Sequence, residues 1–229
     1  MYNFLEIKEP KLRNIILFEL ISWYGRKFQK IWKNNRYKKW ITPVLIDFGC
    51  GNNIKQGWIN ADFFQLPNIK FRRKKVKRRK LDFELDLRYP IGLPENHADG
   101  IYSGHTLEHL YPRQAVNFLT EVYRILKPGA WLRINVPDLA CFVEFYKGII
   151  PAEEFKVYNS GCEAICELTQ DSGHHSVWDE QLLSSMLKNI GFTGIKRVEF
   201  GVEGTDKRLI KEEEIRKWST LVVEAQKPD

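Results

Sequence analysis

The sequence is poor in cysteine and has no long hydrophobic run, and each lack narrows the class of protein. Four cysteines among 229 residues are too few for a disulfide framework, so we expect a reducing, cytoplasmic setting. No apolar stretch reaches the ~20 residues that span a bilayer. Glu6 and Glu9, with no small-residue cleavage site, lead us to expect no signal peptide. Internal repeats and a phosphate loop of the Gly-Lys-Ser/Thr type are also missing.

Acidic residues are scarce in two segments, and this scarcity explains the net charge of +7. Residues 1–40 hold ten Lys or Arg and three Asp or Glu, and residues 70–80 hold nine Lys or Arg and no acid. Elsewhere 26 acidic residues outnumber 17 basic ones. We therefore expect a polyanion or an anionic surface to meet the two basic segments rather than the acidic body of the protein.

The most informative stretch is Val44-Leu-Ile-Asp-Phe-Gly-Cys-Gly-Asn52. An apolar run that reaches Asp47 and then breaks into Gly49 and Gly51 is typical of a buried parallel strand that turns sharply at its carboxyl end. The two glycines let the backbone adopt positive φ and let a ligand approach the peptide groups closely. Open α/β sheets bind their cofactors at this edge.

Apolar periodicity and turn residues predict alternating strands and helices. The expected strands are 44–48, 58–61, 81–85, 99–103, 130–136, 195–200 and 219–225. The expected helices are 10–40, 112–126, 138–147 and 179–190, whereas 148–178 is expected to be irregular. We therefore expect an α/β fold with a mainly parallel sheet between helices. Residues 1–42 would form a basic amphipathic helical segment and residues 43–229 the main domain, with a basic insertion at 70–80.

Two further acids follow later strands at the same edge. Asp62 comes eleven residues after Gly51, where it can accept hydrogen bonds from both hydroxyls of a ribose. A dinucleotide site would need an interval nearer 20 residues with a full helix, so this spacing counts against NAD and FAD. Asp86 and the apolar loop after it can bind an adenine, and the next strand delivers Ser103 and His105 to the same edge.

Seven short motifs occur in a characteristic order: Asp-x-Gly-Cys-Gly, Gly-Trp-Ile-Asn-x-Asp, Asp-Leu-Arg, Asp-x-Ile-Tyr-Ser, Leu-Glu-His-Leu, Tyr-Arg-Ile-Leu-Lys-Pro-Gly and Arg-Ile-x-Val-Pro-Asp. This order resembles class I S-adenosylmethionine-dependent methyltransferases. It is most similar to methyltransferase type 11-like proteins, in a small bacterial subgroup associated with polysaccharide biosynthesis. The match covers residues 44–141 and resumes at 178–192 and 221–228. The basic run at 70–80 and Gly104 depart from the subgroup's pattern.

The resemblance implies a seven-stranded Rossmann-like sheet in the order 3-2-1-4-5-7-6, with one antiparallel strand, and S-adenosyl-L-methionine as the cofactor. The cofactor-binding residues that it implies are Asp47, Gly49, Cys50, Gly51, Asp62, Asp86, Leu87 and Ser103. Residues 47–51, named the glycine loop below, would hold the methionine end, Asp62 the ribose, and Asp86 with Leu87 the adenine. Ser103 and His105 would lie near the sulfonium, where the acceptor enters.

A hydroxyl acceptor needs a neighbouring group that takes its proton, and histidine suits that role near neutral pH. The catalytic candidates are His105, His174 and His175, each of which is alternatively a structural histidine. His174 and His175 lie in a segment that can cover a substrate. His109 is expected to point into the packing of the adjacent helix.

A metal site is not expected. Cys162-x₃-Cys166 with His174 and His175 has the ligand types of a zinc site, but this spacing fits no common structural one. The two cysteines are equally typical of one buried helix face. Cys50 is not expected to act as a nucleophile, because its backbone is what the glycine loop uses.

The expected function is O-methylation of a sugar in a glycan or a lipid-linked glycan precursor, and this acceptor is implied by the subgroup alone. One alternative is an RNA or other nucleic-acid methyltransferase guided by the basic run at 70–80, and a second is a non-catalytic S-adenosylmethionine-binding protein. Segments 10–40 and 70–80 could also contact an anionic membrane. We accordingly expect a cytoplasmic protein, peripheral to the inner face of the membrane if both segments face one side.

Overall fold

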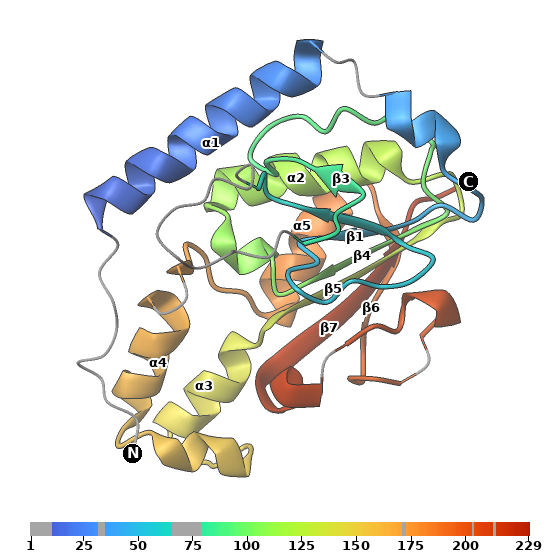
Figure 1. The fold of residues 1–229 in the computed structure, drawn as a ribbon. Helices are drawn as coiled ribbons and strands as arrows, with labels where there is room; N and C mark the ends of the chain where they lie inside the picture. The colour runs from blue at the N-terminus through green and yellow to red at the C-terminus, as the bar shows by residue number, and fades with distance from the viewer. Residues whose placement is uncertain (1–10, 32–34, 66–78, 171–172, 203, 213) are drawn as a thin grey trace.

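The computed structural model describes residues 11–31, 35–65, 79–170, 173–202, 204–212 and 214–229. Within these ranges seven strands form one sheet in the order β3-β2-β1-β4-β5-β7-β6 (Figure 1). The strands are β1 (Leu45–Phe48), β2 (Ile59–Asp62), β3 (Phe83–Glu84), β4 (Gly100–Gly104), β5 (Trp131–Pro137), β6 (Thr193–Val198) and β7 (Thr220–Gln226). Strand β7 runs antiparallel to β5 and β6, and the other neighbours pair in parallel. The expected fold class and strand order are confirmed.

Helices and short 3-10 turns connect the strands. The α-helices are α1 (Leu12–Ile31), α2 (Pro112–Ile125), α3 (Leu139–Tyr146), α4 (Gly161–Gln170) and α5 (Glu180–Ile190). The 3-10 helices are η2 (Asn35–Lys39), η3 (Leu107–His109), η4 (Glu153–Val157), η6 (Lys207–Leu209) and η7 (Glu214–Ser219). The carboxylate of Asp138 caps α3 by accepting a hydrogen bond from the amide of Ala140. Gly191 ends α5 with a φ of 118°.

The two faces of the sheet are covered by different elements. On β1, Ile46 belongs to the main core, which includes apolar residues of α2 and α5, whereas its neighbour Leu45 packs with Leu209 of η6. Successive residues of a strand point to opposite faces. Helices α2 and α5 therefore cover one face, and the segment between β6 and β7 covers part of the other (Figure 1). The connection from β1 to β2 contains no helix, as its short length predicted.

Helix α1 packs against the segments that follow β2 and β3. The rings of Phe18 and Phe63 stack with centroids 4.2 Å apart. Gly25 leaves room for the ring of Phe64, which an added Cβ would meet at 2.4 Å. Ser22 is fully buried and donates a hydrogen bond to the carboxylate of Asp86. Helix α1 thus lies over the edge of the sheet at which β2 and β3 end.

The expectation that residues 148–178 are irregular is wrong, because this segment contains η4 and α4. Ser160 caps α4: its hydroxyl accepts a hydrogen bond from the amide of Glu163, and the carboxylate of Glu163 accepts one from the amide of Asn159, the residue before the cap. Cys162 on this helix is exposed, so Cys162 and Cys166 do not form one buried face.

Two other elements differ from the expected ones by more than a shift of one or two residues. The helix expected over 10–40 ends as an α-helix at Ile31, and a 3-10 helix occupies Asn35–Lys39. The third strand is reduced to Phe83–Glu84. Most of the basic run at 70–80 lies outside the described residues, which resume at Arg79. Among the described residues, no helix combines the length and apolar character that a membrane span requires.

Candidate active site

The glycine loop turns away from β1 at the carboxyl edge of the sheet. Gly49 has a φ of +77°, and a Cβ there would lie 1.9 Å from the hydroxyl oxygen of Thr106, so the close approach of these two segments requires glycine. The amides of Gly49 and Cys50 both donate to the carbonyl of Ala61 on β2. Gly51 has a φ of +56° with nothing within 4 Å of its added Cβ, so its outer side faces open space.

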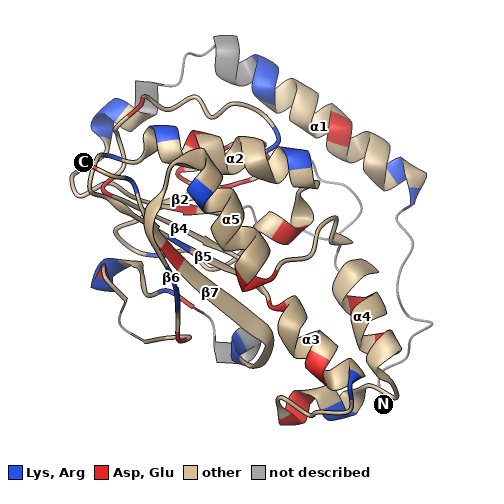
Figure 2. Ribbon diagram, turned by 180° about the vertical axis from the view of Figure 1, so that it is seen from behind, with Lys and Arg blue, Asp and Glu red and all other residues tan. Residues whose placement is uncertain are grey.

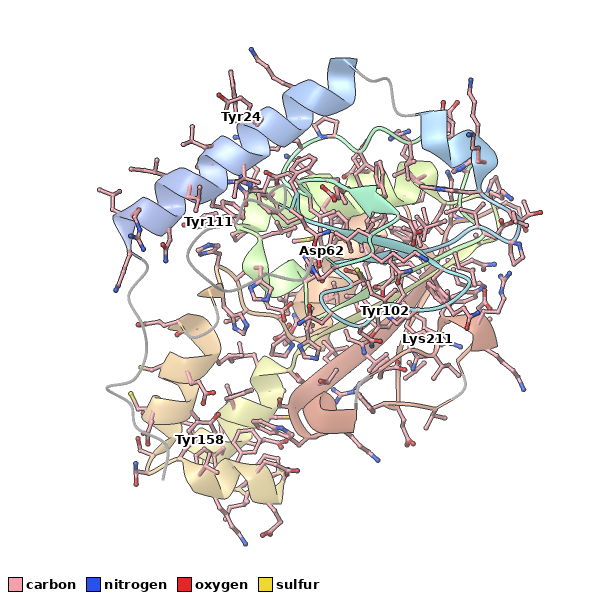
Figure 3. All side chains as sticks on the ribbon, viewed as in Figure 1. Tyr24, Asp62, Tyr102, Tyr111, Tyr158 and Lys211 are labelled. Atoms are coloured by element: carbon pink, nitrogen blue, oxygen red, sulfur yellow. The ribbon has the colours of Figure 1, made fainter. Side chains whose placement is uncertain are left out.

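A cavity of about 560 Å³ opens beside this loop, a volume suited to a small-molecule ligand. Its lining includes the four predicted glycine-loop residues Asp47, Gly49, Cys50 and Gly51, together with the predicted His105. The other lining residues are Asn52, Asn53, Lys55, Tyr102, Gly104, Asn135, Phe200 and Lys211. Figure 3 shows Tyr102 and Lys211 below Asp62 on this side of the sheet.

The predicted acid Asp47 forms an ion pair inside the cavity. The ammonium nitrogen of Lys55 lies 2.5 Å from a carboxylate oxygen of Asp47, and the two side chains are 8% and 2% exposed. The same nitrogen lies 3.9 Å from the ring centre of Tyr102. Burial lowers the pKa of Lys55, and the neighbouring Asp47 opposes that shift. Lys55 thus places a desolvated ammonium group against the glycine loop.

The predicted ribose ligand Asp62 lies next to the cavity without lining it. Its carboxylate accepts a hydrogen bond of 2.7 Å from the amide of Gly51 and pairs with Arg79 at 2.6 Å. Arg79 also donates to the carbonyl of Gly51. Asp62 therefore fixes the glycine loop directly, and a ribose at this carboxylate would meet Arg79.

The predicted adenine ligand Asp86 lies under α1 and does not line the cavity. Its carboxylate pairs with Arg88 at 2.7 Å and accepts a hydrogen bond of 2.6 Å from Ser22. Burial would raise the pKa of Asp86, but the hydrogen bonds from Arg88 and Ser22 outweigh it, so the pKa lies below its usual value. Leu87 beside it packs against the main core. Thus α1 covers this acid.

Ser103 is buried and donates to the carbonyl of Phe48, so its hydroxyl joins β4 to β1 rather than facing the cavity. The thiol of Cys50 is equally unsuited to chemistry. Burial, with the charges of Asp62 and Asp47, raises the pKa of Cys50 to about 12, so the nucleophilic thiolate is scarce at neutral pH.

His105 brings a proton acceptor to the cavity. It follows β4 with a φ of 49°, an uncommon conformation for a residue other than glycine. Its Nδ1 lies 3.3 Å from a carboxylate oxygen of Glu108, and its Nε2 lies 3.0 Å from the hydroxyl of Thr220. Burial would raise the pKa of Glu108, but contact with His105 outweighs it and lowers that pKa. The nearby carboxylate favours a hydrogen on Nδ1, although the two groups form no well-aligned hydrogen bond, and the hydroxyl of Thr220 then donates to Nε2.

The structure does not bring His174 and His175 into the cavity with His105. Nδ1 of His174 lies 2.6 Å from the carbonyl oxygen of Leu168. The ring of His175 stacks on Tyr111 with centroids 4.3 Å apart. His109 is exposed, so the expectation that it points into the helix packing is wrong.

The prediction from sequence missed Lys55, Lys211, Tyr102 and Asn135 as lining residues. Lys55 follows the glycine loop by four residues, and a cation so close to a predicted ligand loop was the available signal. Lys211 reaches the cavity from the segment before β7, more than 150 residues after the loop, and only the folded chain reveals it. The side-chain oxygen of Asn135, Oδ1, is buried and accepts no hydrogen bond from the described residues. It could therefore accept a hydrogen bond from a ligand in the cavity.

A family model described as a methyltransferase domain matches residues 17–197. No curated protein matches the sequence. A solved S-adenosylmethionine-dependent methyltransferase from Archaeoglobus fulgidus is 19% identical, with 93% of this chain and 99% of that chain covered and a TM-score of 0.49. One from Aquifex aeolicus is 16% identical, over 82% and 85% of the two chains, with a TM-score of 0.43.

Phosphoethanolamine N-methyltransferase 2 from Haemonchus contortus, solved with S-adenosyl-L-methionine, is 14% identical over 81% of this chain and 49% of that chain, with a TM-score of 0.47. Identities this low do not identify the methyl acceptor of this chain.

Proposed function

Because this chain belongs to the methyltransferase domain family and is an S-adenosylmethionine-dependent methyltransferase, we propose that its acceptor is a sugar hydroxyl in a glycan or a lipid-linked glycan precursor. The observation that carries the proposal is His105, which lines the cavity beside the glycine loop with Glu108 behind its Nδ1. A hydroxyl must lose its proton as it is methylated, whereas an already neutral amine need not lose one before it attacks. A histidine in this position therefore favours an oxygen acceptor.

The cofactor supplies a methyl group on a positively charged sulfur, which departs as a neutral thioether. With the cofactor bound, Nε2 of His105 would accept the proton of the attacking hydroxyl, taking it in place of the hydrogen bond to Thr220. Alignment of the acceptor is worth about 7–11 kcal/mol of the barrier. A positioned base adds roughly 10²–10⁴-fold in rate.

The other residues of the site bind and orient. The glycine loop offers open space beside Gly51, and the ammonium of Lys55 can neutralise a carboxylate there. Asp62 holds the loop and can accept hydrogen bonds from ribose hydroxyls. We assign proton acceptance to His105 rather than to His174 or His175, since neither of these lines the cavity.

The proposal is tested with cofactor labelled in its methyl group and cell extract separated into glycan, lipid, RNA and protein. We expect label in the glycan or lipid-linked glycan, bound through oxygen. His105→Asn should lower kcat by at least about 10²-fold with little change in cofactor affinity. His97→Asn is the matched control, because His97 precedes β4 and contacts Tyr37 and Trp40 at the opposite edge of the sheet.

Label in the RNA fraction would contradict a glycan acceptor and favour the nucleic-acid methyltransferase. Binding of the cofactor without label in any fraction would favour a non-catalytic binding protein. Equal kcat for His105→Asn and the unsubstituted chain would remove His105 as the base.

The exposed surface of α1 supports peripheral contact with an anionic membrane, where a lipid-linked acceptor resides. Large apolar side chains that are at least two-fifths exposed cover much of the helix: Leu12, Ile15, Ile16, Leu17, Phe18, Leu20, Trp23 and Tyr24. Figure 2 shows Lys or Arg toward both ends of α1 and an acidic residue between them, and the sequence identifies this acid as Glu19. Glu19 is paired with Arg88 at 2.5 Å, so the helix presents apolar and cationic groups together.

Membrane contact is measured by sedimentation with vesicles of phosphatidylcholine alone or mixed with phosphatidylglycerol. We expect retention on the anionic vesicles, lost on replacing Ile16 and Leu20 by serine. Replacing Ile149 and Ile150 by serine is the matched control, because their exposure is similar (56% and 51%, against 51% and 49%). Equal retention by both double variants would remove α1 as the contact.

A further inference from the structure

We propose that Glu108, His109 and His174 form a binding site for a divalent transition metal such as Zn²⁺. One potential ligand atom from each of these residues lies within 4.8 Å of the others. Two histidines and one carboxylate are a donor set suited to zinc and related metals. This site is outside the cavity lining and does not depend on the identity of the methyl acceptor.

The buried carboxylate of Glu108 is the strongest indication. Glu108 is 1% exposed, and neither of its oxygens accepts a well-formed hydrogen bond from another residue in the described part of the chain. It forms an ion pair with His105, at 3.3 Å. Buried charges are normally fully paired or bound to metals. A cation on the side of Glu108 that faces His109 and His174 would complete its neutralisation.

The orientation of the two histidines agrees with metal binding. Nδ1 of His174 lies 2.6 Å from the carbonyl oxygen of Leu168, and a carbonyl can only accept, so Nδ1 carries the hydrogen. Nδ1 of His109 lies 3.4 Å from the carbonyl oxygen of Gly173. Metal-bound histidines commonly donate one ring N–H to a carbonyl and coordinate through the other nitrogen. The same arrangement places the lone pairs of both rings on Nε2.

The backbone holds the two contributing segments together. The amides of His175 and Ser176 both donate to the carbonyl of Glu108, at 2.7 and 3.1 Å. The hydroxyl of Ser176 donates to the carbonyl of Leu107. The rings of His109 and His174 meet at a centroid distance of 5.0 Å. The potential ligand atoms lie within 4.8 Å of one another, whereas tetrahedral zinc needs its donor atoms about 3.3 Å apart, so zinc binding would draw the three side chains closer together.

Three protein ligands leave at least one coordination position of a zinc ion for an oxygen ligand, either water or an acceptor hydroxyl. Glu108 also contacts His105, which lines the cavity, so the proposed metal lies one residue away from the proposed base. Nitrogen ligands favour Zn²⁺ over Mg²⁺, which prefers oxygen.

The test uses the full chain, stripped of metal by a chelator and titrated with Zn²⁺ against a chromophoric competitor. We expect one Zn²⁺ per chain, binding at least tenfold tighter than Mg²⁺. His109→Ala, His174→Ala and Glu108→Gln should each weaken Zn²⁺ binding by tenfold or more. His175→Ala is the matched control for Zn²⁺ binding, because its ring stacks on Tyr111 instead.

His109 is exposed, so its alanine variant keeps the test valid even if Glu108→Gln does not fold; folding is checked by circular dichroism. The absence of a one-to-one zinc complex, or equal affinity in His109→Ala and His175→Ala, would overturn the proposed metal site. Methyl transfer is measured separately. Zinc binding without methyl transfer contradicts the proposed function alone, and methyl transfer without zinc binding contradicts the metal site alone.

Discussion

Asp62→Asn should weaken binding of the cofactor while leaving the fold in place. The carboxylate of Asp62 accepts a hydrogen bond of 2.7 Å from the amide of Gly51 and pairs with Arg79 at 2.6 Å. Asparagine keeps the shape and one acceptor oxygen but removes the charge. Hydrogen bonds to a charged group contribute about 1.5–3 kcal/mol, so the dissociation constant should rise by roughly ten- to 150-fold.

Isothermal titration with S-adenosylmethionine and with S-adenosylhomocysteine measures this change. Asp99→Asn is a closely matched control, because Asp99 also accepts from a backbone amide, that of Val44 at 2.7 Å, and pairs with a cation, Lys127 at 2.6 Å. Asp99 lies at the opposite edge of the sheet, directly before β4. If Asp62→Asn binds the cofactor as tightly as Asp99→Asn does, Asp62 has no part in the cofactor site.

Two other substitutions test the framework of the site. Gly49→Ala should lower the free energy of unfolding by roughly 1–3 kcal/mol, because its Cβ would clash with Thr106 at a positive φ; an unchanged urea midpoint would contradict the clash. Ser22→Ala should cost about 1–3 kcal/mol, because it removes a buried hydrogen bond to Asp86. The lowered pKa of Asp86 contributes stability that is fully present above about pH 4 and is lost as the pH falls through the lower folded-state value. If Ser22→Ala and the unsubstituted chain have the same urea midpoint from neutral pH down to pH 3, both the cost of Ser22→Ala and the pH dependence attributed to Asp86 are refuted.

The sequence was sufficient to predict the sheet and the glycine loop. Apolar runs ending in turn residues mark β1, β4 and β5, because strands buried on both faces are apolar throughout. Gly49 and Gly51 were recognisable because positive φ and close approach both require glycine. His105 was recognisable as a residue of the same edge, because carboxyl ends of parallel strands meet there; its role as a base stays a prediction.

The partners of the predicted acids could not be obtained from local patterns. Asp62 meets Arg79 and Asp86 meets Ser22 only in the folded chain, 17 and 64 residues apart in the sequence. The adenine role of Asp86 and Leu87 therefore stays a prediction, with α1 now known to cover that acid.

Helix α4 and the proposed metal ligands were missed in the sequence for two different reasons. Helix α4 was missed although Ser160-x-x-Glu163 is a capping-box pattern, so in that case a local signal existed. The proximity of Glu108, His109 and His174 had no such signal, because 65 residues separate the two histidines. The metal-ligand types weighed in the sequence were Cys162, Cys166, His174 and His175, whose spacing argued against a zinc site, and the two cysteines are not in the cluster found among the described residues.

The most direct measurement is a crystal structure of the chain with S-adenosylhomocysteine. We predict that electron density for the ligand lies in the cavity between Gly51 and His105, with a carboxylate near Lys55. Density for the ligand at any other place on the protein, with this cavity filled by side chains, would contradict the account.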